Sequence, residues 1–319
     1  MLEKYCPDLQ VLSIPLRNKF RGITTREVAI FRGSEGWSEF GPFLEYDDVE
    51  SSTWMEAALD AANNPWPTLH RDRVAINATL PIVEVDQVAG ILQRFPGSTT
   101  VKIKVDDFEA GAGVVEEVLN LHPDMKIRLD VNGGWDSDEA ISNLLEYHLR
   151  FGNVFEYVEQ PCRTLAELRL VKAEVPIRIA ADESIRKNLG SDFADFAAYA
   201  DVAILKWQPL GGFQRAHQIA AEIGLPVVVS SALETGIGIS HGLALAASFP
   251  TSTFACGLGT VALFEGDICD PAVVPSDGYI EVKRREPKLV ERYLAAPERT
   301  EYWKQRIVRV LELIERRSA

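Results

Sequence analysis

The sequence lacks the features of several protein classes. Its four cysteines show neither a Cys-x-x-Cys spacing nor histidine partners at zinc-finger distances, so we expect no disulfide framework and no structural zinc. No apolar run reaches about 18 residues, and the first ten residues carry acids where an export signal needs a basic and then an apolar stretch. We therefore expect a cytoplasmic protein with reduced, buried thiols and no membrane partner.

Basic residues are also in deficit. Lys and Arg number 33 against 47 Asp and Glu, which gives a formal net charge of −14. A surface of this sign repels phosphate backbones, so we expect no nucleic-acid partner. A small anionic substrate stays compatible with this charge, because a few lysines and a metal reverse the field inside one cavity.

Several short catalytic motifs are missing as well. The sequence contains no GxxxxGK[ST] loop, no GxGxxG after an expected strand, no GxSxG and no HExxH. It thus gives no sign of a phosphate-binding loop, a dinucleotide fold, a serine hydrolase elbow or a zinc protease helix.

What the sequence does contain is a repeated pattern of strand and helix from about residue 74 to 261. Eight β-rich runs recur at intervals of roughly 23 to 29 residues, enough for one strand, one helix and two loops. The expected strands are 74–80, 100–105, 126–131, 155–158, 177–180, 202–205, 227–230 and 253–256. The helices expected between them are 108–122, 137–151, 164–175, 191–200, 212–223 and 239–248. This alternation predicts an α/β fold, a modified (β/α) TIM-type barrel of seven to eight strands.

The two ends of the chain differ from this pattern. Near the N-terminus a strand is expected at 28–32 and a helix at 52–63, and in the tail a strand at 279–282 and a charged helix at 301–317. We expect residues 1–70 to form an α+β capping domain. Residues 71–270 are then the catalytic barrel, and the tail 271–319 packs back on the cap or on the outside of the barrel.

Two lysines share one face of the second expected barrel strand. Lys102 and Lys104 alternate with Val101, Ile103 and Val105, and in a closed barrel one of the two faces is the interior. There, desolvation and mutual repulsion lower the lysine pKa values, so that one lysine is a neutral base at pH 7. A half-solvated strand with two surface lysines is the alternative.

Acidic residues end the next three strands. Asp130, Glu159 and Asp182 each follow apolar strand residues, and the carboxyl ends of neighbouring barrel strands lie side by side around one mouth. Singly, each acid is also typical of a turn or a helix cap. Together they repel unless a divalent cation lies between them, and three carboxylates suit Mg²⁺ rather than zinc.

The last three strands add a lysine and several small residues. Lys206 ends the sixth strand, which lies roughly opposite the second in an eight-stranded barrel, so Lys206 and Lys104 face each other. A lysine that extends outward from the strand end is the alternative. Ser230, Ser231, Gly257 and Gly259 follow strands seven and eight, where small residues let backbone N–H groups approach a ligand carboxylate or simply form turns.

The order of these residues resembles the enolase superfamily, specifically its muconate lactonizing enzyme-like subgroup. The motif is Lys-x-Lys on strand two, an acid on each of strands three to five, and Lys on strand six; residues 36–43 are similar to that superfamily's early Gly-Trp-Gly-Glu stretch. Within the subgroup, the runs 18–22, 230–234 and 257–260 are most similar to the o-succinylbenzoate synthase family.

This resemblance implies a hydro-lyase that acts in menaquinone biosynthesis. The implied reaction is the Mg²⁺-dependent syn-dehydration of 2-succinyl-6-hydroxy-2,4-cyclohexadiene-1-carboxylate to o-succinylbenzoate through an enediolate, with Mn²⁺ as a substitute metal. By resemblance, Asp130, Glu159 and Asp182 bind the metal. Lys104 removes the proton and returns it to the departing hydroxyl, Lys206 stabilises the enediolate, and Lys102 supports Lys104. The resemblance also places seven residues around a dicarboxylate substrate: Phe20, Arg21, Asn132, Ser230, Ser231, Gly257 and Gly259.

The same residues favour or disfavour other activities known from related enzymes. N-succinylamino acid racemization in the same site is the alternative, because lysines on opposite faces also suit a racemase. The eighth strand lacks the Asp-x-Asp that dipeptide epimerases carry, and Thr260 lies near the position where cycloisomerases carry an acid. Both of these activities are therefore disfavoured. A binding barrel without chemistry is disfavoured, because none of the two opposed lysines and three acids is missing.

Overall fold

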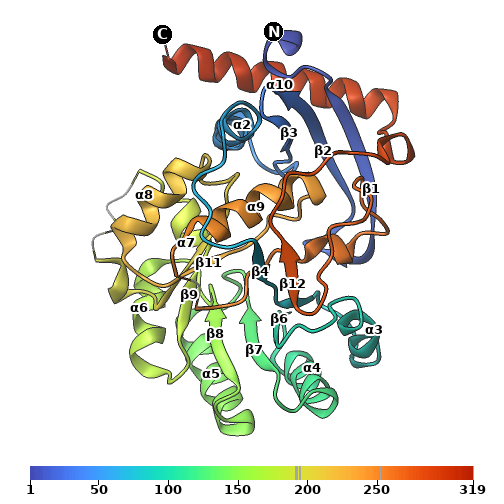
Figure 1. Cartoon of the computed structure of the whole chain (residues 1–319). Coiled ribbons are helices and arrows are strands. Elements are labelled where there is room, and N and C mark those ends of the chain that lie inside the picture. Colours follow the sequence, from blue (N-terminus) through green and yellow to red (C-terminus); the bar gives the residue numbers. More distant parts are fainter. Residues whose placement is uncertain (191–192, 194, 252, 319) are drawn as a thin grey trace.

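A parallel sheet that curls into a barrel forms the centre of the computed structural model, which describes residues 1–190, 193, 195–251 and 253–318 (Figure 1). The sheet has seven strands in the order β11-β10-β9-β8-β7-β6-β5, and all neighbours pair in parallel. The strands are β5 (Ala78–Leu80), β6 (Thr100–Lys104), β7 (Lys126–Asp130), β8 (Phe155–Glu159), β9 (Ile179–Ala181), β10 (Val202–Leu205) and β11 (Val227–Val229).

Residues 256 and 257 connect the two edges of this sheet. Cys256 forms a parallel bridge with Ile76, just before β5, and Gly257 forms one with Ser230, just after β11. The expected eighth strand at 253–256 is therefore reduced to isolated bridges, but it lies where such a strand closes a barrel. The expected α/β barrel of seven to eight strands is confirmed.

Helices lie around the barrel sheet, and several begin at side chains that cap them. Asp107, Asp136 and Thr164 each accept a hydrogen bond from the backbone N–H three residues later. The helices are α3 (Val88–Leu92), α4 (Phe108–Leu121), α5 (Ser137–Phe151), α6 (Leu165–Glu174), α7 (Glu183–Arg186), α8 (Phe213–Ile223) and α9 (Gly236–Ser248).

One expected helix differs from the structure. Within 191–200 the described residues form only a short 3-10 turn at Phe196–Ala198, and residues 191, 192 and 194 lie outside the described part of the chain. In that part, no helix combines the length and apolar character needed to span a membrane.

Strand alternation sends one set of side chains into the barrel. The cross-strand register aligns Lys102 with Arg128 and Tyr157, and it aligns Lys104 with Asp130 and Glu159 two residues further along. Below the charged groups lies a small apolar cluster that includes Tyr157, Ala180, Val202, Ile204 and Val228. This part of the barrel interior is not purely apolar, because the buried Arg128 guanidinium lies 4.7 Å from the centre of the Tyr157 ring.

The N-terminal residues form a separate antiparallel sheet above the barrel (Figure 1). Its strands β1 (Gln10–Phe20), β2 (Ile23–Gly33) and β3 (Gly36–Phe40) pair in sequence order. The helix α2 (Asp48–Asn63) packs on β2 and β3, and the tail helix α10 (Pro297–Ser318) packs on α2, on β1 and on the short α1 (Leu2–Tyr5). We call this assembly of strands and helices the cap.

The tail also contacts the start of the barrel. Its strand β12 (Tyr279–Glu281) pairs antiparallel with β4 (Arg73–Ala75). The run 74–80, which we expect to be one barrel strand, is therefore two strands. The first belongs to this two-stranded ribbon and only the second, β5, joins the barrel.

Trp303 anchors the tail helix to the cap sheet. Its side chain is fully buried, its ring meets Phe40 edge to face at 5.9 Å between centroids, and its indole N–H donates to Glu27 at 3.0 Å. An aromatic residue in this position contributes apolar burial and a satisfied polar atom together.

Replacing Trp303 tests how strongly the tail supports the cap. We expect Trp303→Ala to lower the free energy of unfolding by about 3–5 kcal/mol, because it leaves a large cavity. The exposed Arg316→Ala on the same helix, whose side chain is 74% accessible, is the control and changes it by at most about 0.5 kcal/mol. Urea unfolding measures the free energy of unfolding of both variants. Equal losses in the two variants contradict the role of Trp303 as the anchor of the tail helix.

Candidate active site

Lys102 lies at the centre of a buried charge cluster inside the barrel. Its Nζ is 2.9 Å from Asp130 Oδ2 and 3.0 Å from Glu159 Oε1. Burial alone lowers the pKa of Lys102, but the carboxylates of Asp130 and Glu159 outweigh burial and raise this pKa well above its usual value. The expectation of a lowered pKa is therefore wrong for Lys102, because the acids dominate its surroundings.

Lys104 reaches the same cluster from the end of β6. Its Nζ donates to Asp130 Oδ2 at 2.9 Å and to Asn132 Oδ1 at 2.5 Å, and lies 5.2 Å from the centre of the Phe20 ring. Asn132 in turn donates through Nδ2 to Glu183 Oε1 at 3.4 Å. Lys104 is thus held at the pocket wall by two acceptors and beside an aromatic ring.

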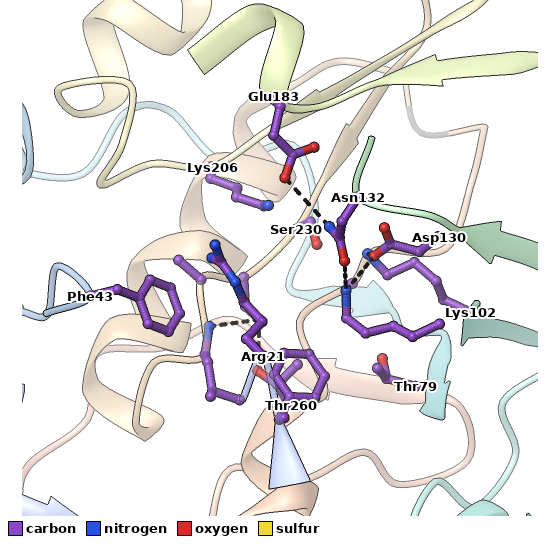
Figure 2. A pocket seen from close by; sticks show the side chains of 16 residues that line it. Arg21, Phe43, Thr79, Lys102, Asp130, Asn132, Glu183, Lys206, Ser230 and Thr260 are labelled. Carbon is purple, nitrogen blue, oxygen red and sulfur yellow. Dashed lines mark hydrogen bonds and ion pairs between the residues drawn. The ribbon is translucent and has the colours of Figure 1, made fainter. Parts of the chain in front are cut away.

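Lys206 approaches from the other side of the barrel. It follows β10, and its Nζ lies 2.5 Å from Asp182 Oδ2. The strands β7, β8 and β9 separate β10 from β6 in the sheet, so in a closed barrel the two lysines point inward from opposite sides. Figure 2 shows Lys206 on one side of the pocket, with Asp130 and Asn132 on the other.

The three expected metal ligands occupy successive strand ends and are all buried. Burial raises the pKa of Glu159 to about 7, and the nearby Asp130 carboxylate adds to this rise. For Asp130, burial opposes ionisation, but the Lys102 and Lys104 ammonium groups outweigh it and lower the pKa. Lys206 and Arg186 likewise outweigh burial and lower the pKa of Asp182. The cluster therefore concentrates negative charge that cations must balance.

The chemistry of this donor set fits a hard divalent cation. Carboxylate oxygens are the ligands that Mg²⁺ prefers, and Asp130 Oδ1 is buried without a hydrogen-bond partner. Over the described ranges, however, no three His, Cys, Asp or Glu side chains are already grouped to hold a metal ion. The lysine ammonium groups contact the acids instead, so a metal ion bound there would have to displace these lysine contacts.

Both opposed lysines line one pocket at the carboxyl ends of the strands. It has a volume of about 40 Å³. The lining residues are Phe20, Arg21, Phe43, Thr79, Lys102, Lys104, Asp130, Asn132, Glu183, Lys206, Ser230, Ser231, Ala232, Leu233, Gly257 and Thr260. A neighbouring cavity of about 440 Å³ shares Phe20, Arg21, Lys104, Asp130 and Asn132 with it. Lys104 and Asp130 therefore lie between a small cavity and a larger one.

The cap contributes one wall through the turn between β1 and β2. Arg21 and Gly22 both have positive φ, 48° and 82°, which makes the turn tight. The Arg21 guanidinium lies 4.3 Å from the centre of the Phe43 ring and donates to Tyr46 Oη at 3.3 Å. Its charge is thus held over the pocket by residues of the cap.

The structure brings most of the expected substrate-binding residues together. Six of the seven line the pocket, and Gly259 does not: a Cβ there would meet Ile76 and Phe95 at 2.8 and 3.1 Å. Gly257 is required where it stands, because a Cβ would lie 2.6 Å from Ser230 Oγ.

Six lining residues were missed by the sequence reasoning: Phe43, Thr79, Glu183, Ala232, Leu233 and Thr260. Two of them carry a local signal. Thr79 pairs with Lys102 in the sheet, so the same alternation points it inward, and Glu183 directly follows Asp182 at the end of β9. Phe43 comes from the cap, and no strand pattern places it.

Two family descriptions match the chain. "Enolase N-terminal domain-like" covers residues 11–62 and "Enolase C-terminal domain-like" covers residues 86–287. An o-succinylbenzoate synthase of Mycobacterium tuberculosis is 43% identical over 312 residues, which are 96% of this chain and 94% of that protein. Another of Mycolicibacterium smegmatis is 44% identical over 94% of each chain. The chain belongs to the o-succinylbenzoate synthase family of the enolase superfamily.

Membership in this family makes the chain an enzyme of the lyase class. Solved structures of enolase relatives share its fold. An L-Ala-D/L-Glu epimerase from Bacillus subtilis superposes with a TM-score of 0.74 at 21% identity and covers 88% of this chain and 96% of its own. A dipeptide epimerase from Enterococcus faecalis, complexed with Mg and a dipeptide, reaches a TM-score of 0.70 at 21% identity, with 88% and 97% covered.

Removing the central cation tests the charge balance of the cluster. We expect Lys102→Met to lower the free energy of unfolding, measured without divalent metal, by about 3–5 kcal/mol, because it removes the cation that pairs with the buried Glu159 carboxylate and leaves Asp130 with Lys104 alone. Arg309→Met is the control: it breaks the exposed pair with Asp48 and costs at most about 1 kcal/mol. Similar losses in the two variants contradict the buried ion cluster.

Proposed function

We propose that this chain is a Mg²⁺-dependent o-succinylbenzoate synthase of menaquinone biosynthesis. It dehydrates 2-succinyl-6-hydroxy-2,4-cyclohexadiene-1-carboxylate to o-succinylbenzoate. Relatives of this name at 43–44% identity over nearly the full length support the activity. The observation that carries it is the placement of Lys104 and Lys206 on opposite sides of one pocket, each in contact with a buried acid.

Lys104 is the residue we assign to proton transfer. As a neutral amine it takes the proton from the ring carbon that bears the carboxylate, and as an ammonium it gives that proton to the departing hydroxyl. A C–H and a C–O bond break, a C=C bond completes the aromatic ring, and water leaves. One base is enough because both groups depart from the same face.

Lys206 keeps its proton and acts through its charge. From the face opposite Lys104 its ammonium stabilises the negative charge that develops on the substrate carboxylate as the enediolate forms. The contact with Asp182 holds this ammonium in place. Lys102, buried between Asp130 and Glu159, supports Lys104 from below and does not need to touch the substrate.

Asp130, Glu159 and Asp182 are the residues that would hold Mg²⁺, with Mn²⁺ as a substitute. A cation bound there would stabilise the developing negative charge on the substrate carboxylate. Asp130 lines the pocket, whereas Glu159 and Asp182 are buried and are not among its lining residues.

The remaining walls suit the second carboxylate of the substrate. The Arg21 guanidinium and the hydroxyl groups of Ser230 and Ser231 line the pocket, and they supply charge-assisted and neutral donors. We place the protein in the cytoplasm, where it acts on this small dicarboxylate and binds neither nucleic acid nor membranes.

Substituting the proposed base tests the assignment directly. In an absorbance assay of o-succinylbenzoate formation with Mg²⁺, we expect Lys104→Ala to lose about 10³-fold of the rate or more, since a general base contributes roughly 10² to 10⁴. Lys172→Ala, which removes a lysine paired with Asp201 outside the pocket, keeps wild-type kinetics. A near-normal rate for Lys104→Ala refutes the role of this lysine.

Metal removal tests the proposed ligand set. We expect EDTA to abolish turnover and added Mg²⁺ or Mn²⁺ to restore it. For Asp130→Asn, the metal concentration that restores half of the activity should be at least tenfold higher than for wild type, because the substitution removes one anionic ligand. Full activity in EDTA contradicts the metal requirement.

Racemization of N-succinylamino acids is the second candidate function. The observation that favours it is again the pair of lysines on opposite sides, since one can remove an α-proton and the other can return one to the opposite face. Incubation of each enantiomer of an N-succinylamino acid in ²H₂O should then introduce deuterium at the α-carbon of both. Absence of exchange from both enantiomers removes this activity.

A further inference from the structure

A second buried charge cluster connects the cap to the barrel. It contains Arg26 of β2, Glu39 of β3 and Glu234 of the loop between β11 and α9, and each side chain is at most 2% exposed. None of the three lines the pocket, so the proposed mechanism leaves them without a role.

The loop they contact is one wall of the pocket. We call residues 230–235 the β11–α9 wall; its first four residues, from Ser230 to Leu233, all line the cavity. Its shape is not one that the local sequence favours, because Leu233 has a positive φ of 64°, a conformation that costs a non-glycine residue about 1 kcal/mol or more. Contacts from outside the wall have to hold it.

Arg26 supplies such contacts from the cap. Its Nε donates to the carbonyl of Leu233 at 3.0 Å, and its Nη2 donates to the carbonyls of Ala232, at 3.4 Å, and Gly41. The same guanidinium lies 4.3 Å from the centre of the ring of Phe43, a cap residue that also lines the cavity. One side chain therefore contacts both the wall and a cap residue of the pocket.

Glu39 holds the other end of the wall. Its carboxylate accepts hydrogen bonds from Thr235 N at 3.1 Å, from Thr235 Oγ1 at 2.5 Å and from Gly238 N at 3.3 Å. These donors belong to the first turn of α9, where a carboxylate also interacts favourably with the helix dipole. The two glutamates pack tightly against the first turn of α9, because a Cβ at Gly238 would lie 2.6 Å from Glu234 Cβ and 3.1 Å from Glu39 Cδ.

Charged groups this deeply buried are costly unless their hydrogen bonds are made. Arg26 donates to two carbonyls of the β11–α9 wall and to the carbonyls of Gly41 and Glu27 in the cap. Glu39 accepts from the backbone and hydroxyl of Thr235 and from the backbone of Gly238. Within the wall, Glu234 Oε2 accepts from the N–H of Ala232 at 2.6 Å and closes the loop on itself. The hydrogen bonds of Arg26 and Glu39 thus offset the cost of their burial at the segment that shapes the cavity, whereas Glu234 Oε1 is buried without a hydrogen-bond partner.

We propose that Arg26 and Glu39 are positioning residues that hold the β11–α9 wall in the shape that receives the substrate. The proposal rests on the proposed function, since it assigns these residues to the binding of that substrate. They act through Ser230, Ser231 and Phe43 and touch no reacting atom.

Steady-state kinetics separate positioning from a purely structural role. The wall contacts the substrate before and during the reaction, so its loosening weakens binding in both states and raises KM. We expect Arg26→Met to raise KM at least tenfold while kcat stays within about threefold, and Arg26→Lys to recover part of the loss. Glu39→Leu behaves like Arg26→Met, whereas Glu39→Gln, which keeps an acceptor oxygen, stays within about threefold of wild type.

Arg299→Met is the matched control. Arg299 is a cap arginine paired with Glu27 on the same strand as Arg26, and it does not line the pocket. It should lower the melting temperature without changing KM. If Arg26→Met and Glu39→Leu also lower only the melting temperature and leave KM unchanged, the proposal is wrong.

Hydrogen exchange of the substrate-free enzyme gives an independent test. We expect amides of residues 230–238 to exchange at least tenfold faster in Arg26→Met than in wild type and Arg299→Met. If Arg26→Met does not fold, Arg26→Lys shows the same increase to a smaller extent. Unchanged exchange in the folded variant refutes the positioning role. The two failures are distinguishable. If the wild-type protein does not turn over the substrate, but Arg26→Met still speeds exchange of residues 230–238, the proposed function is wrong and the bracing of the wall stands.

Discussion

The structure depends on the balance of charge inside the closed barrel. Three carboxylates at successive strand ends are removed from water, and each is stable there only because a cation lies against it. Lys102, Lys104 and Lys206 provide those cations, each within 3.0 Å of an acid. The same requirement that stabilises the fold thus brings the proposed metal ligands and the proposed proton-transfer residue together in one place.

The barrel and the core of the site could be predicted because both follow from periodicity. In a parallel barrel the strand repeat fixes which ends meet, and alternation along a strand fixes which side chains point inward. This is why Lys102, Lys104, Asp130 and Lys206 were found from the chain alone. The pKa of Lys102 was predicted in the wrong direction, because the sequence shows its neighbour Lys104 but not the distance to the acids of the adjacent strands.

The cap side of the pocket could not be predicted in the same way. Phe43 and the braced wall depend on contacts between segments some 200 residues apart in the chain, such as Arg26 with Leu233, and no repeat relates them. Positive φ at Arg21 and Leu233 also runs against local preference, and only tertiary contacts sustain it. The pocket shows the result, because residues of both the cap and the barrel line it.

The most direct test of the account is a crystal structure with Mn²⁺ and o-succinylbenzoate bound, in which anomalous scattering locates the metal. The account predicts a metal peak bonded to Asp130, Glu159 and Asp182, with Lys104 and Lys206 on opposite faces of the ligand ring. A metal bound elsewhere, or two lysines on the same face, would contradict it.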